Sequence, residues 1–179
     1  MSWASYYHHA LFGDVLLLIY EPEARPFSNQ KKGNVVAIYD EKNTLIGVNI
    51  FDFSSFMKMK AKGRIPVFPH PVLEVINNIL KNANLPTLEE PKTSGFIIGT
   101  VKEIKENTML VSYQNQEFEM KRIPILVGEQ LLIALPETIL FNGKKVHEYY
   151  PIKENEMEAL TSNEYIVFHR EKEEDFFLR

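Results

Sequence analysis

The first half of the chain alternates between apolar runs and polar turns in a pattern that predicts several strands followed by one helix. Residues 15–20 are aliphatic residues and a tyrosine, and two further apolar runs flank the polar residues 40–44, as in a β-hairpin. Residues 70–84 instead repeat aliphatic side chains at helical spacing, with Pro71 in the first turn and Asn84 at the end. We therefore expect an α+β domain over residues 1–91.

A polar segment, residues 85–95, separates this part from the rest of the chain, because it contains two prolines and adjacent glutamates. Gly99 lies inside the first apolar run beyond it, where a glycine often marks the bend of a coiled sheet. Roughly five short strands with little helix over residues 92–179 are typical of an all-β OB-fold-like barrel. The predicted strands cover residues 96–105, 108–113, 117–123, 129–135 and 163–170.

Composition narrows the possible classes of protein. The 179 residues are 45% hydrophobic and include no cysteine, which excludes disulfides, thiolate metal ligands and cysteine nucleophiles. The longest apolar runs fall far short of the ~20 residues that span a bilayer, and the N-terminus lacks the pattern of a signal peptide. We expect a cytoplasmic protein with no membrane association.

Charge is distributed unevenly along the chain, whose formal net charge is -4. Residues 1–91 hold nine basic and nine acidic side chains, whereas residues 92–179 hold eleven basic and fifteen acidic ones. Proteins that bind nucleic acid usually show the opposite bias, because neutralisation of phosphates by Lys and Arg supplies most of their affinity. Composition therefore argues against tight non-specific RNA binding, and it leaves room for a local basic stripe.

Six basic residues of the second half are candidates for such a stripe. Two lie on its first predicted strand, two on the adjoining hairpin and two after an Asn-Gly turn, so a five-stranded barrel could bring them to one face. They are Lys102, Lys105, Lys121, Arg122, Lys144 and Lys145. The alternative is a set of scattered, solvated side chains, because four glutamates between residues 103 and 119 interrupt the stripe.

Two aromatic residues near these cations are candidates for stacking on unpaired bases, an interaction that contributes ~1–3 kcal/mol per base. The alternation of apolar and polar positions favours Phe118 as a core residue, on the same face as Met120. For Tyr113, core packing and base stacking both remain open, since a hydroxyl group suits a position at the rim.

No residue pattern indicates catalysis, a cofactor or a metal site. His8 and His9 are adjacent, and neighbouring side chains of a strand point to opposite faces, so these two cannot readily share one ion. Ser54 and Ser55 lack the context of a nucleophile elbow, and no glycine-rich phosphate loop occurs. We therefore expect a protein that is not an enzyme and that uses no cofactor.

The C-terminal segment is strongly acidic. Four of the five residues 171–175 are acidic, and Phe176 and Phe177 follow them. One interpretation is a frayed, solvated terminus. The other is a docking segment whose two rings pack on a partner or back on the body of the protein.

Three stretches resemble a family of small bacterial tRNA-binding proteins. They are GVNIFDFSSF at residues 47–56, GTVKEIKE at residues 99–106 and VGEQLLIALPE at residues 127–137. In that family an N-terminal α+β domain precedes an OB-fold similar to the tRNA-binding domain of the bacterial phenylalanyl-tRNA synthetase β subunit. The resemblance covers about residues 12–168, and it implies that tRNA or another structured RNA is the partner.

The chain departs from that family where RNA recognition is expected. The family's His-Pro…Ala-Asp-Lys-Leu segment is shortened here to ENTML, residues 106–110, and its Ser-x-Gly-Met motif appears as SNEY, residues 162–165. The resemblance places Asn107, Ser162 and Asn163 beside the RNA, where Glu164 adds bulk and negative charge. The alternative is a non-catalytic protein-interaction or dimerisation module, with a protein partner or a homodimer, whose OB-fold has lost RNA binding.

Overall fold

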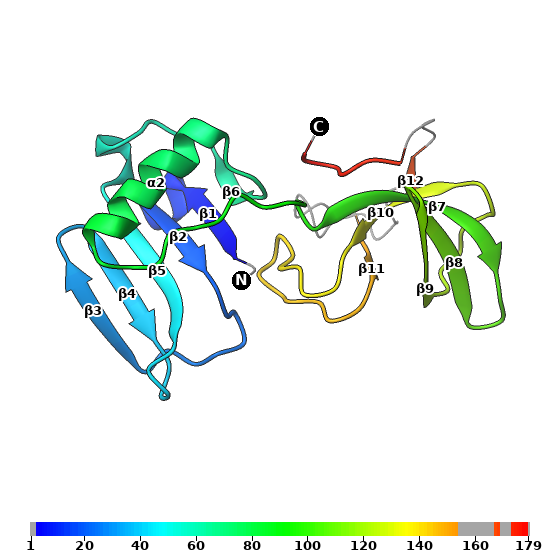
Figure 1. The fold of residues 1–179 in the computed structure, drawn as a ribbon, viewed down its shortest axis with the longest axis horizontal. Helices are drawn as coiled ribbons and strands as arrows, with labels where there is room; N and C mark the ends of the chain where they lie inside the picture. The colour runs from blue at the N-terminus through cyan, green and yellow to red at the C-terminus, as the bar shows by residue number, and fades with distance from the viewer. Residues whose placement is uncertain (1–2, 154–166, 169–172, 179) are drawn as a thin grey trace. The chain divides into compact units, whose positions relative to one another are not determined.

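Most of the regular secondary structure of the chain is antiparallel β-sheet, with few helices (Figure 1). The computed structural model describes residues 3–153, 167–168 and 173–178. The chain divides into two units, residues 1–92 and residues 93–179. In the described ranges no helix is long and apolar enough to cross a membrane.

The first unit contains a six-stranded antiparallel sheet in the order β3-β4-β5-β2-β1-β6. Its strands are β1 (Ala4–His8), β2 (Val15–Ile19), β3 (Ser28–Lys32), β4 (Val35–Tyr39), β5 (Leu45–Phe51) and β6 (Lys62–Ile65). Strands β4 and β5 form the predicted hairpin, in which the Asp40 carboxylate accepts hydrogen bonds from the N–H groups of Lys42 (2.9 Å) and Thr44 (2.8 Å). Strand β3 is an edge strand, and all five of its residues are exposed.

The predicted helix of this unit is confirmed as α2 (His70–Asn82), which packs on one face of the sheet (Figure 1). Pro71 lies in its first turn, where the missing N–H group needs no partner. Just beyond its end, Asn84 adopts a φ of 61°. Ile76 and Leu80 are fully buried, in the same apolar core as side chains of β2 and β5.

Asp14 links β1 to a short helical turn. It follows α1 (His9–Phe12) in the chain, and the turn to which it bonds is the 3₁₀ turn η1 (Phe53–Ser55). The Asp14 carboxylate accepts hydrogen bonds from the Tyr7 hydroxyl (2.8 Å), the Ser54 N–H (2.9 Å) and the Ser54 hydroxyl (2.5 Å). Although burial alone would raise the pKa of Asp14, the hydrogen bonds from Ser54 and Tyr7 lower it.

The second unit contains a curled, half-barrel antiparallel sheet in the order β11-β10-β7-β8-β9, with β12 also paired to β10. Its strands are β7 (Phe96–Ile104), β8 (Thr108–Tyr113), β9 (Gln116–Lys121), β10 (Gln130–Ala134), β11 (Tyr150–Pro151) and β12 (Val167–Phe168). Gly99 sits where the strands approach closely, since a Cβ there would lie 2.7 Å from Cγ1 of Val111 and 3.1 Å from the carbonyl oxygen of Ser112. A bulge in β7 between Val101 and Glu103 adds to the bend.

Strand β10 is buried on both faces, as its continuous apolar sequence predicts. Leu131 and Ile133 belong to one apolar cluster, and Leu132 and Ala134 belong to another, because successive side chains of a strand point to opposite faces. Of the predicted last strand, residues 163–170, the structure describes the two residues of β12, and the others lie outside the described residues.

The acidic C-terminal segment packs back on the second unit. Residues 173–178 run beside β7, where the Ile98 N–H donates a hydrogen bond to the carbonyl oxygen of Glu174 (2.9 Å). The Phe177 ring packs against Phe96 with centroids 5.5 Å apart. The interpretation of a frayed terminus is therefore wrong for these residues, and of the docking alternatives the structure shows the rings packed on the body of the protein.

Asp175 anchors this segment. Its carboxylate accepts hydrogen bonds from the Ser94 hydroxyl (2.5 Å), the Ser94 N–H (2.9 Å) and the Thr93 hydroxyl (2.7 Å). It also accepts from the N–H groups of Phe177 (3.1 Å) and Leu178 (2.9 Å). Burial alone would raise the pKa of the Asp175 carboxyl, but these bonds lower it, so the group is an anion held by its donors.

Candidate nucleic-acid interface

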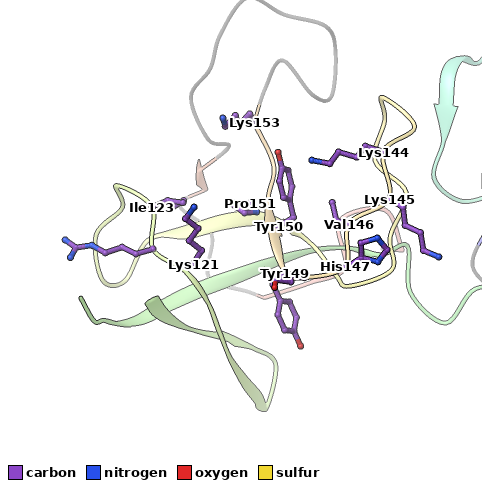
Figure 2. A pocket seen from close by; sticks show the side chains of 12 residues that line it. Lys121, Ile123, Lys144, Lys145, Val146, His147, Tyr149, Tyr150, Pro151 and Lys153 are labelled. Carbon is purple, nitrogen blue, oxygen red and sulfur yellow. The ribbon is translucent and has the colours of Figure 1, made fainter. Parts of the chain in front are cut away.

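A pocket of about 530 Å³ opens in the second unit, largely between residues 121–123 and residues 144–153 (Figure 2). Five of the side chains that line it are cationic, and one, Glu148, is acidic. The cationic residues are Lys121, Arg122, Lys144, Lys145 and Lys153, and we call this pocket the cationic pocket. Four of these five belong to the predicted stripe, so the fold gathers much of it at one pocket in a chain whose net charge is -4.

The cations reach the pocket from the end of a strand and from a tight turn. Lys121 is the last residue of β9, and Arg122 follows it. Lys144 and Lys145 follow the turn at residues 142–143, where the glycine has a φ of 86° and the asparagine side chain accepts a hydrogen bond from the N–H of Lys144 (3.0 Å). The Asn-Gly turn therefore determines where the side chains of these two lysines begin.

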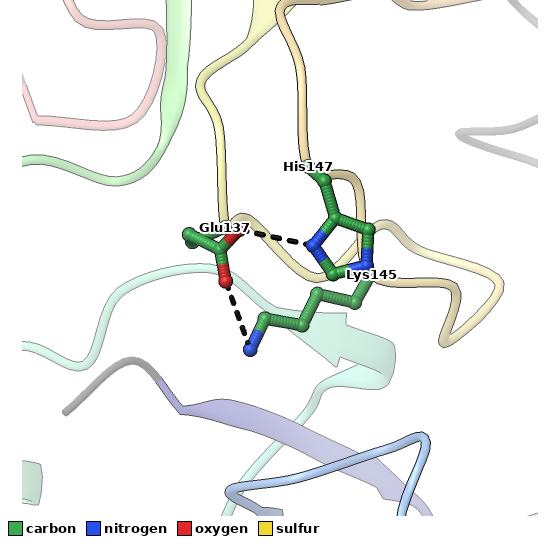
Figure 3. Close-up of polar contacts among 3 residues, drawn as sticks. All are labelled: Glu137, Lys145 and His147. Atoms are coloured by element: carbon green, nitrogen blue, oxygen red, sulfur yellow. Dashed lines mark hydrogen bonds and ion pairs between the residues drawn. The ribbon is translucent and has the colours of Figure 1, made fainter.

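Glu137 pairs with two side chains of the pocket lining (Figure 3). Its Oε2 lies 3.1 Å from Nζ of Lys145, and its Oε1 lies 3.0 Å from Nδ1 of His147. The hydrogen bonds from His147 and Lys145 lower the pKa of the Glu137 carboxyl. The Lys145 side chain is only 10% exposed, so Glu137 already balances its charge before any ligand arrives.

Two tyrosines give the pocket aromatic surface. The Nζ atom of Lys144 lies 5.8 Å from the centroid of the Tyr150 ring, within cation–π range. The Tyr149 ring stacks on Phe118 with centroids 3.9 Å apart and planes 12° apart. Phe118 is half-buried and packs on the apolar cluster that contains Met120, as the alternation of the strand favours.

Two lysines of the predicted stripe, Lys102 and Lys105, do not line this pocket. Both are exposed near the end of β7. Lys105 forms an ion pair and a hydrogen bond with Glu119, which raise the pKa of the Lys105 ammonium group. Glu119, one of the four glutamates that interrupt the predicted stripe, therefore pairs with one of its six cations.

Tyr113 lies in a carboxylate environment. Its ring is half-buried, and it is among the side chains packed on the apolar cluster of Met120. Burial raises the pKa of its hydroxyl, and the nearby carboxylates of Asp175 and Glu173 raise it further. Because phosphate would be repelled there, Tyr113 is placed better for core packing than for contact with RNA.

The three positions that the family resemblance placed beside RNA are only partly described. Asn107 lines a second pocket of about 500 Å³, which shares four lining residues with the first, namely Lys121, His147, Glu148 and Tyr149. Asn107 is therefore near the cationic pocket without lining it. Ser162 and Asn163 lie outside the described residues.

Of the lining residues that were not anticipated from the sequence, three are a lysine and two tyrosines, namely Lys153, Tyr149 and Tyr150. They lie in or after the segment that leads into β11, a strand of two residues with no apolar alternation. Their only signal is the order of residue types, two aromatic residues followed closely by a lysine. Such a signal is weak without knowledge of where the segment runs.

The pocket is suited to binding a ligand that carries both negative charge and planar rings. Arg122 donates from Nη1 to the carbonyl oxygens of Lys105 (3.3 Å) and Glu106 (3.4 Å), and a guanidinium group carries five N–H donors in all. Lysine ammonium groups and a guanidinium group can neutralise phosphates, and tyrosine rings can stack on bases. Within the described part of the chain, no group of three or more His, Asp or Glu side chains could hold a metal ion.

Comparison with protein families finds a match in the first unit. A family described as a "Domain of unknown function (DUF4479)" matches residues 22–88. No curated protein matches the chain. The match lies outside the cationic pocket, so the function of that pocket has to be argued from its own chemistry.

Proposed function

We propose that the second unit binds structured RNA, with tRNA as the first candidate, through phosphate contacts in the cationic pocket. The observation that carries this proposal is the gathering of five lysine and arginine side chains, with two tyrosines, around one pocket of an acidic chain. Phosphate neutralisation supplies most of the affinity of such sites, and a local excess of cations is what it requires.

The roles within the pocket differ. Lys121, Lys144 and Lys153 offer ammonium groups to phosphates. Lys145 contributes less to phosphate binding, because its ammonium group is already paired with the Glu137 carboxylate. The ring of Tyr150, beside the Lys144 ammonium group, is positioned for stacking on an unpaired base, so a loop or a single-stranded end of the RNA is the expected contact.

We further propose that this unit is an OB-fold-like barrel that acts without catalysis, joined to an α+β N-terminal domain. The curled sheet supports this assignment, since β7 is central, pairs with both β8 and β10, and bends at Gly99 and at its bulge. OB-folds commonly bind oligonucleotides on the open face of such a sheet. The stretches at residues 99–106 and 127–137, which resemble the tRNA-binding family, contribute part of β7 and all of β10.

A protein-interaction or dimerisation module is the second candidate. Leu126 is 71% exposed and Val127 is 59% exposed, side by side in the loop before β10. A partner that covered both side chains would remove this apolar surface from water. Glu137 and Glu148, at or beside the pocket, would also weaken attraction for phosphate.

A salt titration of tRNA binding, followed by fluorescence anisotropy, separates the two candidates. The test variant carries Lys121→Gln, Lys144→Gln and Lys153→Gln, and the matched controls are Lys102→Gln and Lys42→Gln, exposed lysines that do not line the pocket. Each phosphate contact adds ~0.7–0.9 to the slope of log affinity against log salt, so the triple variant should lose about two units of slope. The controls should keep the slope of the parent chain.

Two results would refute RNA binding at this pocket. One is a triple variant whose slope equals that of the parent chain. The other is negligible affinity of the parent chain for tRNA at low salt. If the second result comes with a concentration-dependent dimer in sedimentation that Leu126→Ser disrupts, the interaction module is the better assignment.

A further inference from the structure

The first unit carries a row of lysines on an extended segment that leads into β6. In residues 57–62 the side chains alternate: Met57, Met59 and Ala61 pack on the apolar core, and the residues between them are exposed. The exposed residues are Lys58, Lys60 and Lys62, here called the lysine row. Because the apolar positions fix the segment on the core, the lysines point outward on its other side in single file.

The spacing of the lysine row is regular. Two residues of extended chain span at most ~7 Å, so the Cα atoms of neighbouring lysines in the row lie within that distance of each other. This is comparable with the separation of successive phosphates along an extended nucleic-acid strand. The end of the row is held in the sheet, since Lys62 lies opposite His8 where the edge strand β6 pairs with β1 (Figure 1).

The sequence around the lysine row lacks carboxylates between Asp52 and Glu74. Residues 53–73 contain no Asp or Glu, and neither do residues 1–13, which include the paired strand β1. The carboxylate of Asp14 is engaged by Ser54 and Tyr7, and that of Glu74 lies 3.5 Å from His70. Among the described residues, the three lysines of the row have no ion-pair partner.

We propose that the lysine row binds the phosphodiester backbone of single-stranded nucleic acid, as a site in the first unit separate from the cationic pocket. A linear row of charges on a segment that is held against the core matches a linear polyanion. Phe56, 45% exposed and two residues before the row, offers a ring on which an unpaired base can stack. The row lies within residues 22–88, so it assigns a binding activity to the matched domain of unknown function.

A membrane surface is the rival ligand for lysines beside an exposed aromatic ring. Stable attachment to anionic lipid generally needs an amphipathic helix or a broad basic patch, and the row is one residue wide. Single-stranded nucleic acid is therefore the ligand to which the geometry points. Recognition of the backbone alone predicts that RNA and DNA of the same length bind comparably.

The test uses fluorescein-labelled 12-nucleotide oligouridylate and oligothymidylate with the full chain. To remove binding at the cationic pocket, every measurement is made in the Lys121→Gln, Lys144→Gln, Lys153→Gln background. The row variant adds Lys58→Gln, Lys60→Gln and Lys62→Gln. The matched control instead adds Lys42→Gln, Lys81→Gln and Lys92→Gln, exposed lysines of the first unit with the same change in charge.

The background protein and the control should bind both oligonucleotides, and the row variant should lose about two units of salt slope, since each single-strand phosphate contact adds ~0.7. Equal slopes for the row variant and the control would overturn the proposal. So would the absence of oligonucleotide binding by the background protein, or row-dependent binding to phosphatidylserine vesicles alone. These results do not depend on whether the cationic pocket binds RNA, because the background protein already lacks three of the lysines that line that pocket.

Discussion

Replacing Asp175 with alanine should unfold the second unit more easily while leaving the first unit unaffected. The Asp175 carboxylate is 9% exposed and accepts five hydrogen bonds, two of them from Ser94, which is itself buried. The Ser94 Oγ also lies 3.1 Å from the carbonyl oxygen of Phe96, so in the variant the single hydroxyl hydrogen can turn to that acceptor. The Ser94 N–H loses the acceptor that Asp175 supplies.

The size of the effect follows from these donors. A buried donor without an acceptor costs about 1–3 kcal/mol, and each hydrogen bond to a charged group contributes about 1.5–3 kcal/mol, although such terms are not additive. We expect the Asp175→Ala variant to lose about 3 kcal/mol of the free energy of unfolding of the second unit. Asp175→Asn keeps one acceptor oxygen and the shape of the side chain, so it should lose less.

The assay exploits the single tryptophan. Trp3 stacks on Phe68 in the first unit, with ring centroids 5.3 Å apart, so its fluorescence follows that unit in a urea titration, whereas far-ultraviolet circular dichroism follows both. In Asp175→Ala, only the circular-dichroism transition of the second unit should move to lower urea. If its midpoint matches that of the parent chain, or if the Trp3 transition moves equally, the anchoring role of Asp175 is wrong.

The pH dependence provides a second check on the same residue. The pKa of Asp175 is lower in the folded chain than its ordinary value of 3.8, so the folded state binds the proton less readily than the unfolded state. The stability that Asp175 contributes is therefore fully present above the ordinary carboxyl pKa, and it is lost as the pH falls through the lower, folded value. The stability difference between the parent chain and Asp175→Asn should shrink over that range.

Two further predictions concern the curvature of the sheet and the pocket. Gly99→Ala places a Cβ 2.7 Å from Cγ1 of Val111, so it should destabilise the second unit by about 1–3 kcal/mol. The thermal midpoint of unfolding, followed by circular dichroism, should therefore fall. An unchanged midpoint would contradict the close packing at Gly99. Glu137→Gln removes the negative charge that balances Lys145, so tRNA should bind a few-fold more tightly in fluorescence anisotropy. Weaker binding would show that Glu137 positions this side chain for the ligand.

Elements whose signals are local could be predicted from the sequence. The helix α2 follows from the spacing of residues such as Ile76 and Leu80, with Pro71 and Asn84 marking its ends. The full burial of β10 follows from its unbroken apolar run. The place where the C-terminal segment docks could not be predicted, because Asp175 is anchored by Thr93 and Ser94, which lie more than 80 positions earlier in the chain.

The cationic pocket was predictable only in part, for a related reason. Charge and turn type marked Lys121 and Lys144, and both line the pocket. Lys105 was assigned to the same set, but its ion pair with Glu119 depends on how β9 comes to lie beyond β8. Lys153 was missed because it follows a segment with little regular structure, whose path is fixed by tertiary contacts alone.

The exposed edge strand β3 has a consequence for the solution behaviour of the protein. An unpaired strand edge is a template on which further strands of other molecules can add, and this is how many sheets aggregate. Lys31 and Lys32 occupy adjacent positions of β3, so their side chains project to opposite sides of the sheet. Any incoming strand would have to accommodate an ammonium group on each side, and these two lysines therefore discourage growth of the sheet into fibrils.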